Sequence, residues 1–316
     1  MAAYRKHLPQ TDGENIFISD GGLETTLIYH NGIDLPAFAS FPLLRDEDGR
    51  AALRTYYRTY MELAIEHHLG FIIETPTWRA NPDWGTELGF PPETLAAINR
   101  DAVAMMMHLR SQYETPWSPM PISGNIGPRG DGYRPQNLMS VAEAEAYHAP
   151  QVRTFRGAGA DLVTAMTINY AEEGAGIARA AADAELPVVI SLTVETDGHL
   201  ATGQSLGDAI DAIDAASDAA PAYYMVNCAH PTHFADVLAT GGAWVDRIGG
   251  LRPNASARSH AELDAATELD DGDPRDFGLR TAELRRRHGR LTVFGGCCGT
   301  DHRHLGEICL ACAAVH

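Results

Sequence analysis

The sequence has no uninterrupted apolar run approaching the roughly 20 residues that a membrane-spanning helix needs. Its opening residues, MAAYRKHLPQTDGEN, have no apolar stretch after the basic residues and so do not indicate a secretory signal. Basic residues are also few, since 24 Lys and Arg stand against 42 Asp and Glu, for a net charge of −18. This excess of negative charge repels phosphate groups and disfavours general binding to nucleic acids or acidic membranes. We expect a cytoplasmic protein.

Cysteine is scarce as well, and its number argues against a fold stabilised by disulfides. The chain of 316 residues has 5 cysteines, an odd number, at positions 228, 297, 298, 309 and 312. In a reducing compartment such residues are free thiols or metal ligands. The hydrophobic fraction of 45% and the charged fraction of 21% are typical of a globular chain, so disorder throughout is excluded.

Short apolar, β-branched runs recur along the whole chain, and each ends in a loop that contains Gly, Pro, Asn or Asp. Continuous apolar runs of this length are typical of parallel strands that are buried on both faces. The predicted strands cover residues 16–19, 71–75, 121–125, 162–166, 188–192, 223–227, 247–250 and 291–294. Segments typical of helices lie between them, at residues 50–68, 95–113, 142–158 and 206–219.

This alternation predicts a (β/α)8 TIM barrel, formed by a single domain over residues 1–316. The main alternative is a doubly wound open sheet, which usually has a G-x-G-x-x-G turn after its first strand. The first predicted strand is instead followed by Asp20-Gly21-Gly22-Leu23-Glu24, which breaks that pattern. Residues 253–276 are the least regular segment, and we expect them to form a long surface loop, free to move, near the seventh strand.

Three cysteines occupy the ends of predicted strands that are far apart in the sequence. Cys228 ends the sixth run, whereas Cys297 and Cys298 follow the eighth. The carboxyl ends of all strands of such a barrel converge on one face, so we expect the three thiols to lie close together. Three thiolates that leave a fourth position vacant suit a catalytic Zn²⁺ ion. The alternative is that each is a small buried residue, as isolated cysteines commonly are.

The adjacent pair sets a geometric requirement. Neighbouring side chains on an extended strand point to opposite faces, so Cys297 and Cys298 cannot both bind one metal while the backbone stays extended. Gly295, Gly296 and Gly299 flank the pair, and we expect these glycines to adopt the unusual φ values that turn both sulfurs the same way. This match between requirement and flanking residues favours metal binding over core packing.

The remaining thiols and two nearby histidines have less specific patterns. Cys309 and Cys312 lie three residues apart in an apolar, helix-like segment and so share one face. Core packing is the favoured interpretation, with a second metal or redox site as the alternative. His302 and His304 follow the Cys-Cys-Gly-Thr turn, where they are ligands, the start of a helix or exposed residues.

A metal held by three cysteines indicates sulfur chemistry. A free thiol with a pKa of about 8.5 is only a few per cent thiolate at neutral pH, and coordination to zinc removes the remaining proton. Three thiolate ligands suit the activation of sulfur better than the polarisation of water, for which histidine and carboxylate ligands are more usual. The predicted reaction is therefore attack by a substrate thiolate on an electrophilic carbon.

A series of short motifs follows one another along nearly the whole chain. They are Asp-Gly-Gly at 20–22, Glu-Thr at 74–75, Gly-Asn-Ile-Gly-Pro at 124–128, Gly-Ala-Asp-Leu at 159–162, Asn-Cys at 227–228, Pro-Asn-Ala at 253–255 and the highly specific Gly-Gly-Cys-Cys-Gly-Thr at 295–300. Together they resemble the homocysteine S-methyltransferase family. The resemblance implies a zinc-dependent (β/α)8 barrel that methylates homocysteine to methionine, with Cys228, Cys297 and Cys298 as the zinc ligands.

The resemblance also implies where the substrates bind. Asp20, Gly21 and Thr75 correspond to family positions that hold the amino-acid end of homocysteine. Asn125, within its motif, and Glu24 complete the predicted substrate-binding set. Methyl donors consistent with a lone barrel are small sulfonium compounds, such as S-methylmethionine or S-adenosylmethionine, or a quaternary ammonium compound such as betaine. The predicted partners are thus a small thiol and a small donor, and the sequence leaves a homo-oligomer open.

One departure from the family pattern bears on the substrate. The family usually has a glutamate at the end of the fourth strand that binds the substrate ammonium, and Met166 occupies that place. A thioether cannot replace a carboxylate as the partner of an ammonium group. Either Glu172, Glu173 or Glu24 compensates, or the substrate is a different thiol.

Further alternatives concern the second loop and the function itself. Trp78 beside Arg79 in the loop after the second strand either binds a carboxylate, stacks on a planar or cationic group, or packs within the loop. The chain is alternatively the partner of a separate methyl-carrying corrinoid protein. A third possibility is a non-catalytic barrel with a structural metal that binds an amino-acid-like ligand. Closure of the metal site by a histidine would favour this last interpretation.

Overall fold

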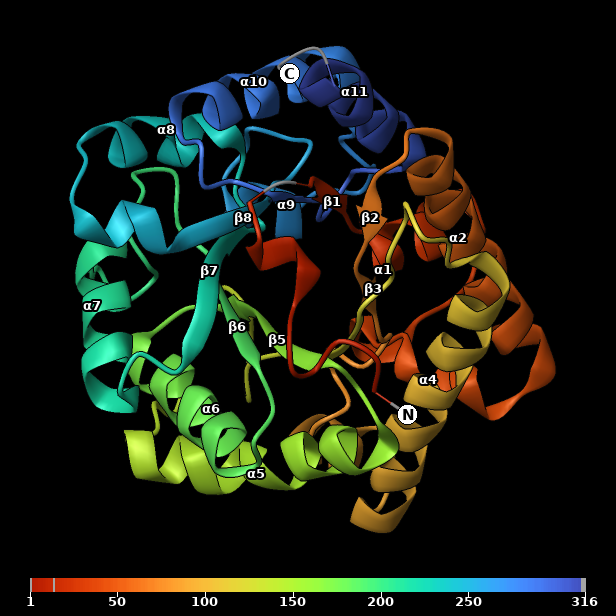
Figure 1. Ribbon diagram of the computed structural model, residues 1–316. Coiled ribbons are helices and arrows are strands. Elements are labelled where there is room, and N and C mark those ends of the chain that lie inside the picture. The colour runs from red at the N-terminus through yellow and green to blue at the C-terminus, as the bar shows by residue number, and fades with distance from the viewer. Residues whose placement is uncertain (1, 14, 314–316) are drawn as a thin grey trace.

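The computed structural model describes residues 2–13 and 15–313. Within these residues, nine short strands form one sheet in which all neighbouring strands are parallel (Figure 1). They are β1 (Phe17–Ile18), β2 (Gly70–Phe71), β3 (Ile73–Glu74), β4 (Ile122–Ile126), β5 (Leu162–Ile168), β6 (Val188–Leu192), β7 (Pro221–Asn227), β8 (Ile248–Arg252) and β9 (Val293–Phe294).

The order of the strands closes the sheet into a barrel. It runs β2-β1-β9-β8-β7-β6-β5-β4-β3, and Ile72 alone separates β2 from β3, so these two are halves of one barrel strand. Every predicted strand is present in this ring. The fold is therefore the predicted (β/α)8 barrel, and the closed ring excludes the doubly wound open sheet.

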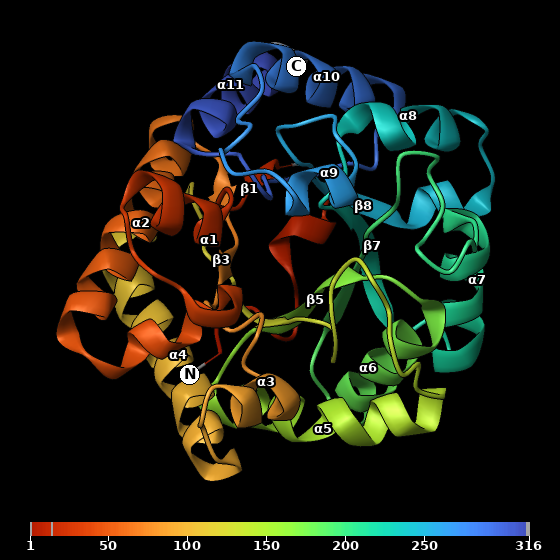
Figure 2. The same cartoon turned by 180° about the vertical axis from the view of Figure 1, so that it is seen from behind.

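Most helices surround the ring on its outer side, whereas α9 (His260–Asp264) lies over one end of the barrel, as both views of the ribbon show (Figures 1 and 2). In the described residues the helices are α1 (Leu23–Thr25), α2 (Glu47–Glu66), α3 (Pro82–Glu87), α4 (Pro92–Tyr113), α5 (Val141–Ala158), α6 (Ala171–Asp183), α7 (Leu206–Ser217), α8 (Pro231–Ala239), α9, α10 (Pro274–Arg287) and α11 (His302–Ala313). The four predicted helices are α2, α4, α5 and α7, and their ends lie within three residues of the predicted ends.

Local sequence signals set the ends of these helices. Asp46 precedes α2, and its carboxylate accepts a hydrogen bond from the Gly49 amide at 2.7 Å. Ser140 and Glu143 form a capping box at the start of α5, and Gly159 ends that helix with a φ of 95°. These caps satisfy backbone groups that a helix end would otherwise leave without partners.

The interior of the barrel has two layers of inward-facing side chains, because successive residues on a strand point to opposite faces. The layer nearer the amino ends of the strands is apolar and consists of Leu8, Phe17, Ile72, Leu162, Val189, Tyr223, Met225 and Val293. The layer two residues further along is buried but polar, and consists of Ser19, Glu74, Ser123, Thr164, Ser191, Asn227 and Arg252. Polar side chains thus lie directly beneath the carboxyl ends of the strands, where such barrels place their active sites.

The N-terminal segment 2–13 lies across the opposite, amino-terminal end of the barrel (Figure 1). Leu8 packs into the apolar layer. The carboxylate of Asp161 accepts hydrogen bonds from the amides of Ala3 and Tyr4 at 2.6 and 2.7 Å. Asp161 also forms a 2.7 Å ion pair with Arg110 of α4. These contacts fix the segment over this end of the barrel.

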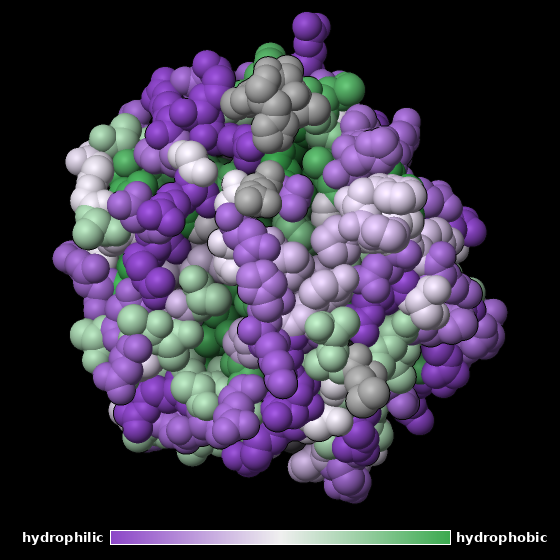
Figure 3. Space-filling view, viewed as in Figure 1, coloured by the Kyte–Doolittle hydropathy of each residue, from purple (hydrophilic) through white to green (hydrophobic). Residues whose placement is uncertain are grey.

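The outer surface matches the charged composition of the chain. Figure 3 shows mostly hydrophilic side chains on the face that carries the N-terminal segment, with hydrophobic ones scattered between them. None of the helices in the described part of the chain is long and apolar enough to cross a membrane.

Gly124 of β4 offers a test of the packing between the barrel and its helices. A Cβ atom at this position would lie 2.5 Å from the ring of Phe155 in α5, which is completely buried. We expect Gly124→Ala to lower the free energy of unfolding by about 1–3 kcal/mol, because the packed core has no space for the methyl group. Gly157→Ala, on α5 with open space around the new Cβ, should raise it by about 0.5–1 kcal/mol. Urea denaturation measures both changes, and equal effects would contradict this packing.

Candidate active site

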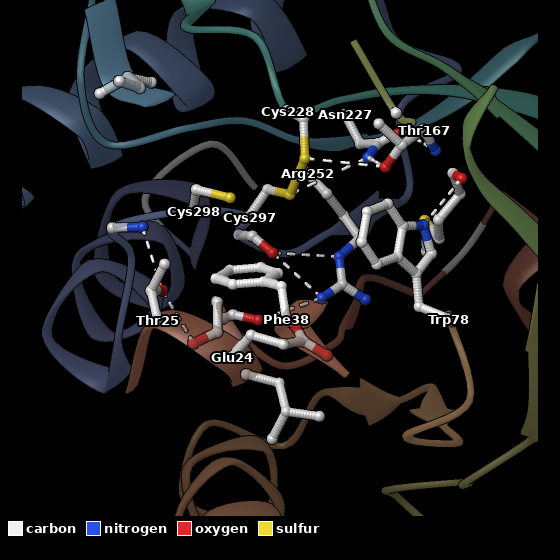
Figure 4. Close-up of a pocket in the computed structure, with 18 of the residues that line it drawn as sticks. Glu24, Thr25, Phe38, Trp78, Thr167, Asn227, Cys228, Arg252, Cys297 and Cys298 are labelled. Atoms are coloured by element: carbon white, nitrogen blue, oxygen red, sulfur yellow. Dashed lines mark hydrogen bonds between the residues drawn. A yellow bond between two sulfur atoms is a disulfide. The ribbon is translucent and has the colours of Figure 1, made fainter. Parts of the chain in front are cut away.

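A cavity of about 330 Å³ opens at the carboxyl ends of the strands (Figure 4). Residues from the ends of many strands line it. They include residues 20–25 after β1, residues 74–76, 78 and 79 at and after β3, Asn125 in β4, Met166 and Thr167 in β5, Asn227 and Cys228 at the end of β7, Arg252 in β8, and residues 296–299 after β9. Parts of two loops, residues 131–133 after β4 and several of residues 256–270 after β8, complete the enclosure. Strand ends from the whole length of the chain therefore meet at this cavity.

The three cysteines at strand ends lie together in the cavity wall, as predicted. The Sγ atoms of Cys228, Cys297 and Cys298 all lie within 4.8 Å of one another. Cys228 and Cys297 are joined as a disulfide, and Cys298 is a free thiol. The expectation of no disulfide is therefore wrong, because barrel closure brings the Cα atoms of this pair to 5.3 Å, within disulfide range.

Once reduced, the same three sulfurs fit a single metal ion. They offer three soft donors, which is the ligand chemistry that zinc and related ions favour. Among the described residues, no histidine or carboxylate joins this cluster. The protein thus leaves at least one coordination position to another ligand, which argues against a fully closed structural site.

Two positions at the sulfur cluster have a left-handed backbone conformation. Cys228 has a φ of 53°, and Gly299 has a φ of 78°, so the predicted unusual φ is confirmed for Gly299. It is wrong for Gly295 and Gly296, which do not have positive φ. These two glycines are needed for space instead, because a Cβ would overlap Ser19 Oγ at Gly295 and the Thr300 side chain at Gly296.

Asn227 organises the wall beside the sulfurs. Its Oδ1 accepts hydrogen bonds from Ser191 Oγ at 2.6 Å and from the Thr167 amide at 3.0 Å. Its Nδ2 donates to Thr167 Oγ1 at 2.8 Å and lies 3.9 Å from Cys297 Sγ. Thr167 Oγ1 lies 3.8 Å from Cys228 Sγ. The sequence analysis did not identify Asn227 or Thr167 as site residues, although an asparagine directly before a strand-end cysteine was a usable signal.

Thr167 adopts a conformation that its own chemistry disfavours. Its φ is 62°, at a shift in the register of β5, and β-branched residues rarely occupy this left-handed region. The surrounding hydrogen bonds hold it there. Such imposed conformations concentrate at functional sites.

Arg252 is a further site residue that the sequence analysis missed. It is buried at the end of β8, and its Nη2 forms a 2.8 Å ion pair with Asp20 Oδ1. Its Nε and Nη2 donate to the Gly296 carbonyl at 3.1 and 3.0 Å, directly before the cysteine pair. A charged residue at an inward-facing position of a buried strand was the signal that pointed to it.

Burial shifts the pKa of several groups in the cavity. It raises the pKa of Glu74 to about 7, although Arg252 and two neighbouring hydroxyls act in the opposite direction. Burial likewise raises the pKa of Glu24, and it raises the pKa of the Cys298 thiol to about 11. A group that stabilises the thiolate is therefore needed before Cys298 can ionise at neutral pH.

Two loops form the roof of the cavity. Tyr133, in the loop after β4, stacks on His260 of α9 with ring centroids 4.0 Å apart, and its hydroxyl lies 3.7 Å from Cys298 Sγ. His260 Nε2 contacts the Cys228 carbonyl at 2.6 Å, and its Nδ1 lies 3.2 Å from Glu195 Oε1. The roof is thus tied to the backbone and the side chains of the cysteine cluster.

Residues 253–276 do follow the seventh barrel strand, β8, but they are not a simple surface loop. They include α9, and residues 253–256 are buried. Asn254 Nδ2 donates to the Cys228 carbonyl at 3.0 Å, and Ser256 Oγ donates to Asp270 at 2.8 Å. The expectation is corrected because this segment covers the cavity and forms part of its wall.

The predicted substrate-binding residues all line the cavity, and they are Asp20, Gly21, Glu24, Thr75 and Asn125. Glu24 Oε1 accepts a hydrogen bond from Ser40 Oγ at 2.8 Å. Thr75 Oγ1 accepts from the Asn125 amide at 2.9 Å. Asn125 Oδ1 is buried and has no hydrogen-bond partner among the described residues, so it is available to a ligand.

Met166 lies in the cavity wall with 5% of its surface exposed. Glu172 and Glu173 do not compensate for it, because both belong to α6 in the outer layer and neither lines the cavity. Glu172 is exposed, and Glu173 is buried 2.9 Å from His148 Nε2. The structure therefore leaves Glu24 as the remaining candidate of the three.

The pair Trp78 and Arg79 is packed, which was one of its predicted alternatives. The Arg79 guanidinium lies 4.4 Å from the Trp78 ring and 3.8 Å from the Trp84 ring. Its Nη1 donates to the Gly130 carbonyl at 3.2 Å. Both residues line the cavity, so the stack forms a rigid side of it.

The remaining cysteines and histidines have structural roles. Cys309 and Cys312 belong to the main hydrophobic core, and burial raises the pKa of the two thiols to about 12 and about 11. This confirms core packing rather than a second metal site. His302 begins α11 and is exposed, while His304 is buried 3.2 Å from Asp301, so neither belongs to the cysteine cluster.

Comparisons with known proteins agree with the fold and the motifs. The family description "Homocysteine S-methyltransferase" matches residues 17–312. Homocysteine S-methyltransferase from Escherichia coli (strain K12) is 27% identical over 211 residues, which cover 63% of this chain and 65% of that relative, slightly less than two thirds of its length.

Solved structures of the homocysteine methyltransferase MmuM from Escherichia coli are similar in fold. The metallated form has a TM-score of 0.72 at 18% identity and covers 96% of this chain and 98% of that one. The oxidized form has a TM-score of 0.72 at 21% identity and covers 94% and 96%. The predicted resemblance and the predicted barrel are therefore confirmed, and the family match agrees with the prediction of an S-methyltransferase.

Proposed function

Because the chain belongs to the homocysteine S-methyltransferase family, we propose that it transfers a methyl group from a small cationic donor to the sulfur of homocysteine. The observation that carries this proposal is the position of the three cysteine sulfurs, within 4.8 Å of one another in the wall of a cavity of about 330 Å³. A cavity of that size accommodates a small ligand beside the sulfurs.

Zinc is the proposed cofactor, and Cys228, Cys297 and Cys298 are its proposed ligands. The all-sulfur donor set supports this assignment, provided that the Cys228–Cys297 disulfide is reduced. When bound, the metal would supply a low pKa for a coordinated substrate thiol, so that the thiol reacts as its thiolate. Asn227 and Thr167 would hold the sulfurs in place through the contacts described above.

The residues around the sulfurs would orient the thiol substrate. Gly21 and Gly22 let the loop after β1 pack closely against residues 297–300, since a Cβ on either would collide with atoms of that segment. Asn125 offers the free Oδ1, and Thr75 a hydroxyl, on the side formed by β3 and β4. With Asp20 and Glu24, these residues form the proposed substrate-binding set.

The residues of the loops that cover the cavity suit a cationic methyl donor. Four acidic residues, Asp131, Asp264, Glu268 and Asp270, line the cavity. Trp78 and Tyr133 supply aromatic rings in the same enclosure. Carboxylates attract a sulfonium or quaternary ammonium group, and aromatic faces bind such cations favourably. A sulfonium compound or a betaine-like compound therefore fits this side of the cavity.

A different thiol is the second candidate, and Met166 is the observation that favours it. Its thioether lies in the cavity wall at the position where the family usually places a glutamate. A thiol without an ammonium group at that point would lose nothing by this replacement.

The reaction is tested with reduced, zinc-loaded protein, homocysteine and three donors: S-methylmethionine, S-adenosylmethionine and betaine. We expect methionine to form with at least one donor, as measured by mass spectrometry. Parallel reactions contain 4-mercaptobutanoate or 3-mercaptopropylamine in place of homocysteine. Methylation of one of these thiols without methylation of homocysteine would favour the second candidate, and methylation of no thiol would contradict the proposal.

A further inference from the structure

Besides Asp20 Oδ1, whose charge is paired with Arg252, two buried atoms of opposite charge type in residues that line the cavity have no hydrogen-bond partner. Glu74 Oε2 and Arg252 Nη1 are both unpartnered among the described residues, and the two side chains are only 4% and 7% exposed. Both residues line the cavity. Buried polar atoms are nearly always hydrogen-bonded in folded proteins, so this pair requires an explanation.

The other atoms of Arg252 are fully used. Nη2 pairs with Asp20 Oδ1 at 2.8 Å, and Nε and Nη2 both donate to the Gly296 carbonyl. These contacts fix the guanidinium plane and leave Nη1 as the one nitrogen without an acceptor. The fixed plane therefore holds a single, preorganised donor that has no acceptor in the protein, in a residue that lines the cavity.

Glu74 is held in a similar way. It ends β3, and the hydroxyls of Ser123 and Thr164, from the next two strands of the polar layer, act on its carboxyl group. Ser123 Oγ and Thr164 Oγ1 are themselves 2.8 Å apart, so this side of the carboxyl group is enclosed. Oε2 is buried without a hydrogen-bond partner, in a residue that lines the cavity.

We propose that Glu74 Oε2 accepts hydrogen bonds from the ammonium group of the thiol substrate, while Arg252 Nη1 donates to its carboxylate. The substrate is thereby defined as an α-amino acid that carries a thiol, and this assignment rests on the proposed function. An α-amino acid bears both charged groups on one carbon, which matches two opposite charges in the wall of one cavity. Glu74 thus supplies the carboxylate that is missing at Met166.

The other acidic candidates do not serve as well. Glu24 already accepts a hydrogen bond from Ser40 Oγ at 2.8 Å. Asp20 is occupied by Arg252 and by the Tyr56 hydroxyl at 3.1 Å. Glu74 combines an unpartnered oxygen with a largely buried position in the cavity wall, where a cationic group of a ligand would compensate its charge.

The protonation of Glu74 makes binding depend on pH. The charged and titratable groups that act on it, or on which it acts, are Asp20 after β1, Arg252 of β8, Tyr57 of α2 and Tyr223 of β7, with Glu24 in the same cavity. Burial raises the pKa of both tyrosines, so they stay neutral. Glu74, with a pKa raised to about 7, ionises in the neutral range, and an ammonium ligand favours the ionised form.

The test compares substrates that differ by one charged group. Homocysteine has both groups, 4-mercaptobutanoate lacks the ammonium, and 3-mercaptopropylamine lacks the carboxylate. We expect Glu74→Gln to lower kcat/KM for homocysteine about 10-fold to 100-fold, as a lost charged hydrogen bond does. Its kcat/KM for 4-mercaptobutanoate should change less than about threefold, because that thiol has no group for Glu74 to hold. Glu172→Gln, on the exposed side of α6, is the matched control and should leave both values unchanged.

A binding measurement separates this inference from catalysis. Methionine binding to the wild-type protein, followed by calorimetry, should tighten about tenfold between pH 6 and pH 8 and release protons, because Glu74 must ionise. Glu74→Gln should bind methionine more weakly and without this pH dependence.

Opposite results identify which proposal is wrong. If the wild type methylates homocysteine but Glu74→Gln keeps the wild-type ratio between homocysteine and 4-mercaptobutanoate, the ammonium site is wrong and the function stands. If Met166→Glu raises that ratio more than about tenfold, the ammonium site lies on β5 and the inference is likewise overturned. If no thiol is methylated while methionine binds with the expected pH dependence, the function is wrong and the site stands.

Discussion

Cys298→Ser is expected to lose its metal, from about one zinc ion per chain in the reduced wild type to less than about a tenth. A hydroxyl is a poor ligand for this ion, and two remaining sulfurs do not hold it against dilution. Methyl transfer should fall at least about a hundredfold, since even changes outside the ligand shell have effects of up to that size. Elemental analysis of the reduced, desalted protein measures the metal, and product formation measures activity.

Cys309→Ser is the matched control for this variant. Cys309 is a free thiol like Cys298, but it lies in the hydrophobic core and outside the sulfur cluster. It should keep its full metal content, with a loss of stability as its main effect. Full metal in Cys298→Ser, or equal loss in both variants, would refute the assignment of the cluster. Cys298 is preferred for this test because Cys228 and Cys297 also pair as a disulfide.

Arg252→Met should lower the free energy of unfolding by about 3–5 kcal/mol, the range for removing one partner of a buried ion pair. Arg252 and Asp20 are 7% and 3% exposed, and methionine would leave the Asp20 carboxylate buried without its cation. The Gly296 carbonyl would lose its donor as well. Glu74 would lose a positive charge that holds its pKa down, so it would become more fully protonated. Denaturation by guanidinium chloride measures the loss.

Arg247→Met provides the comparison. Arg247 also forms an ion pair with an aspartate, Asp214 at 2.8 Å, but the side chains of that pair are 30% and 22% exposed. Solvent screens this pair and hydrates the remaining carboxylate, so the loss should be about 1 kcal/mol or less. Equal losses for the two arginine variants would show that the buried Arg252–Asp20 ion pair contributes no more to stability than the partly exposed Arg247–Asp214 pair.

The barrel itself could be predicted because its signals are local and repeated. A run such as residues 188–192 contains only apolar or small residues and ends in a loop, and it forms β6 with the same bounds. The split of the second barrel strand at Ile72 was not predictable, because it depends on how β1 and β4 pair with either side. Helix ends agreed to within three residues, since caps such as Ser140 are encoded beside them.

The proximity of the three cysteines could be predicted from the topology of the barrel, but most of the residues around them could not. Cys228 and Cys297 are 69 residues apart, and only the rule that strand ends converge brings them together. Arg252 and Thr167 escaped notice because their directions depend on the register of β8 and on a register shift in β5. Register is set by pairing between strands, which a single strand sequence does not reveal.

Loops were predicted least well, because their positions also depend on contacts with residues far away in the sequence. Glu172 and Glu173 seemed close enough to Met166 in sequence to replace its missing charge, yet α6 carries them to the outer layer. Residues 253–276 contain many Asp, Ala and Ser residues, which resembles an exposed loop, but Asn254 and Ser256 find buried partners. Long-range contacts decided both outcomes, and composition alone does not contain them.

The seam between the first and last strands has a consequence for the order of folding. Gly22 donates to the Thr300 carbonyl at 3.0 Å, and Gly296 donates to the Asp20 carbonyl at the same distance. Contacts between residues so far apart in sequence require the closure of a long loop, which costs conformational entropy. We therefore expect them to form after the helices and the neighbouring strand–helix units. Cys228 and Cys297 follow β7 and β9, on either side of β8, so their sulfurs meet when the last strand docks and before the seam itself closes. A thiol-specific probe that reports their proximity during refolding would therefore time the docking of β9, the step on which closure of the ring depends.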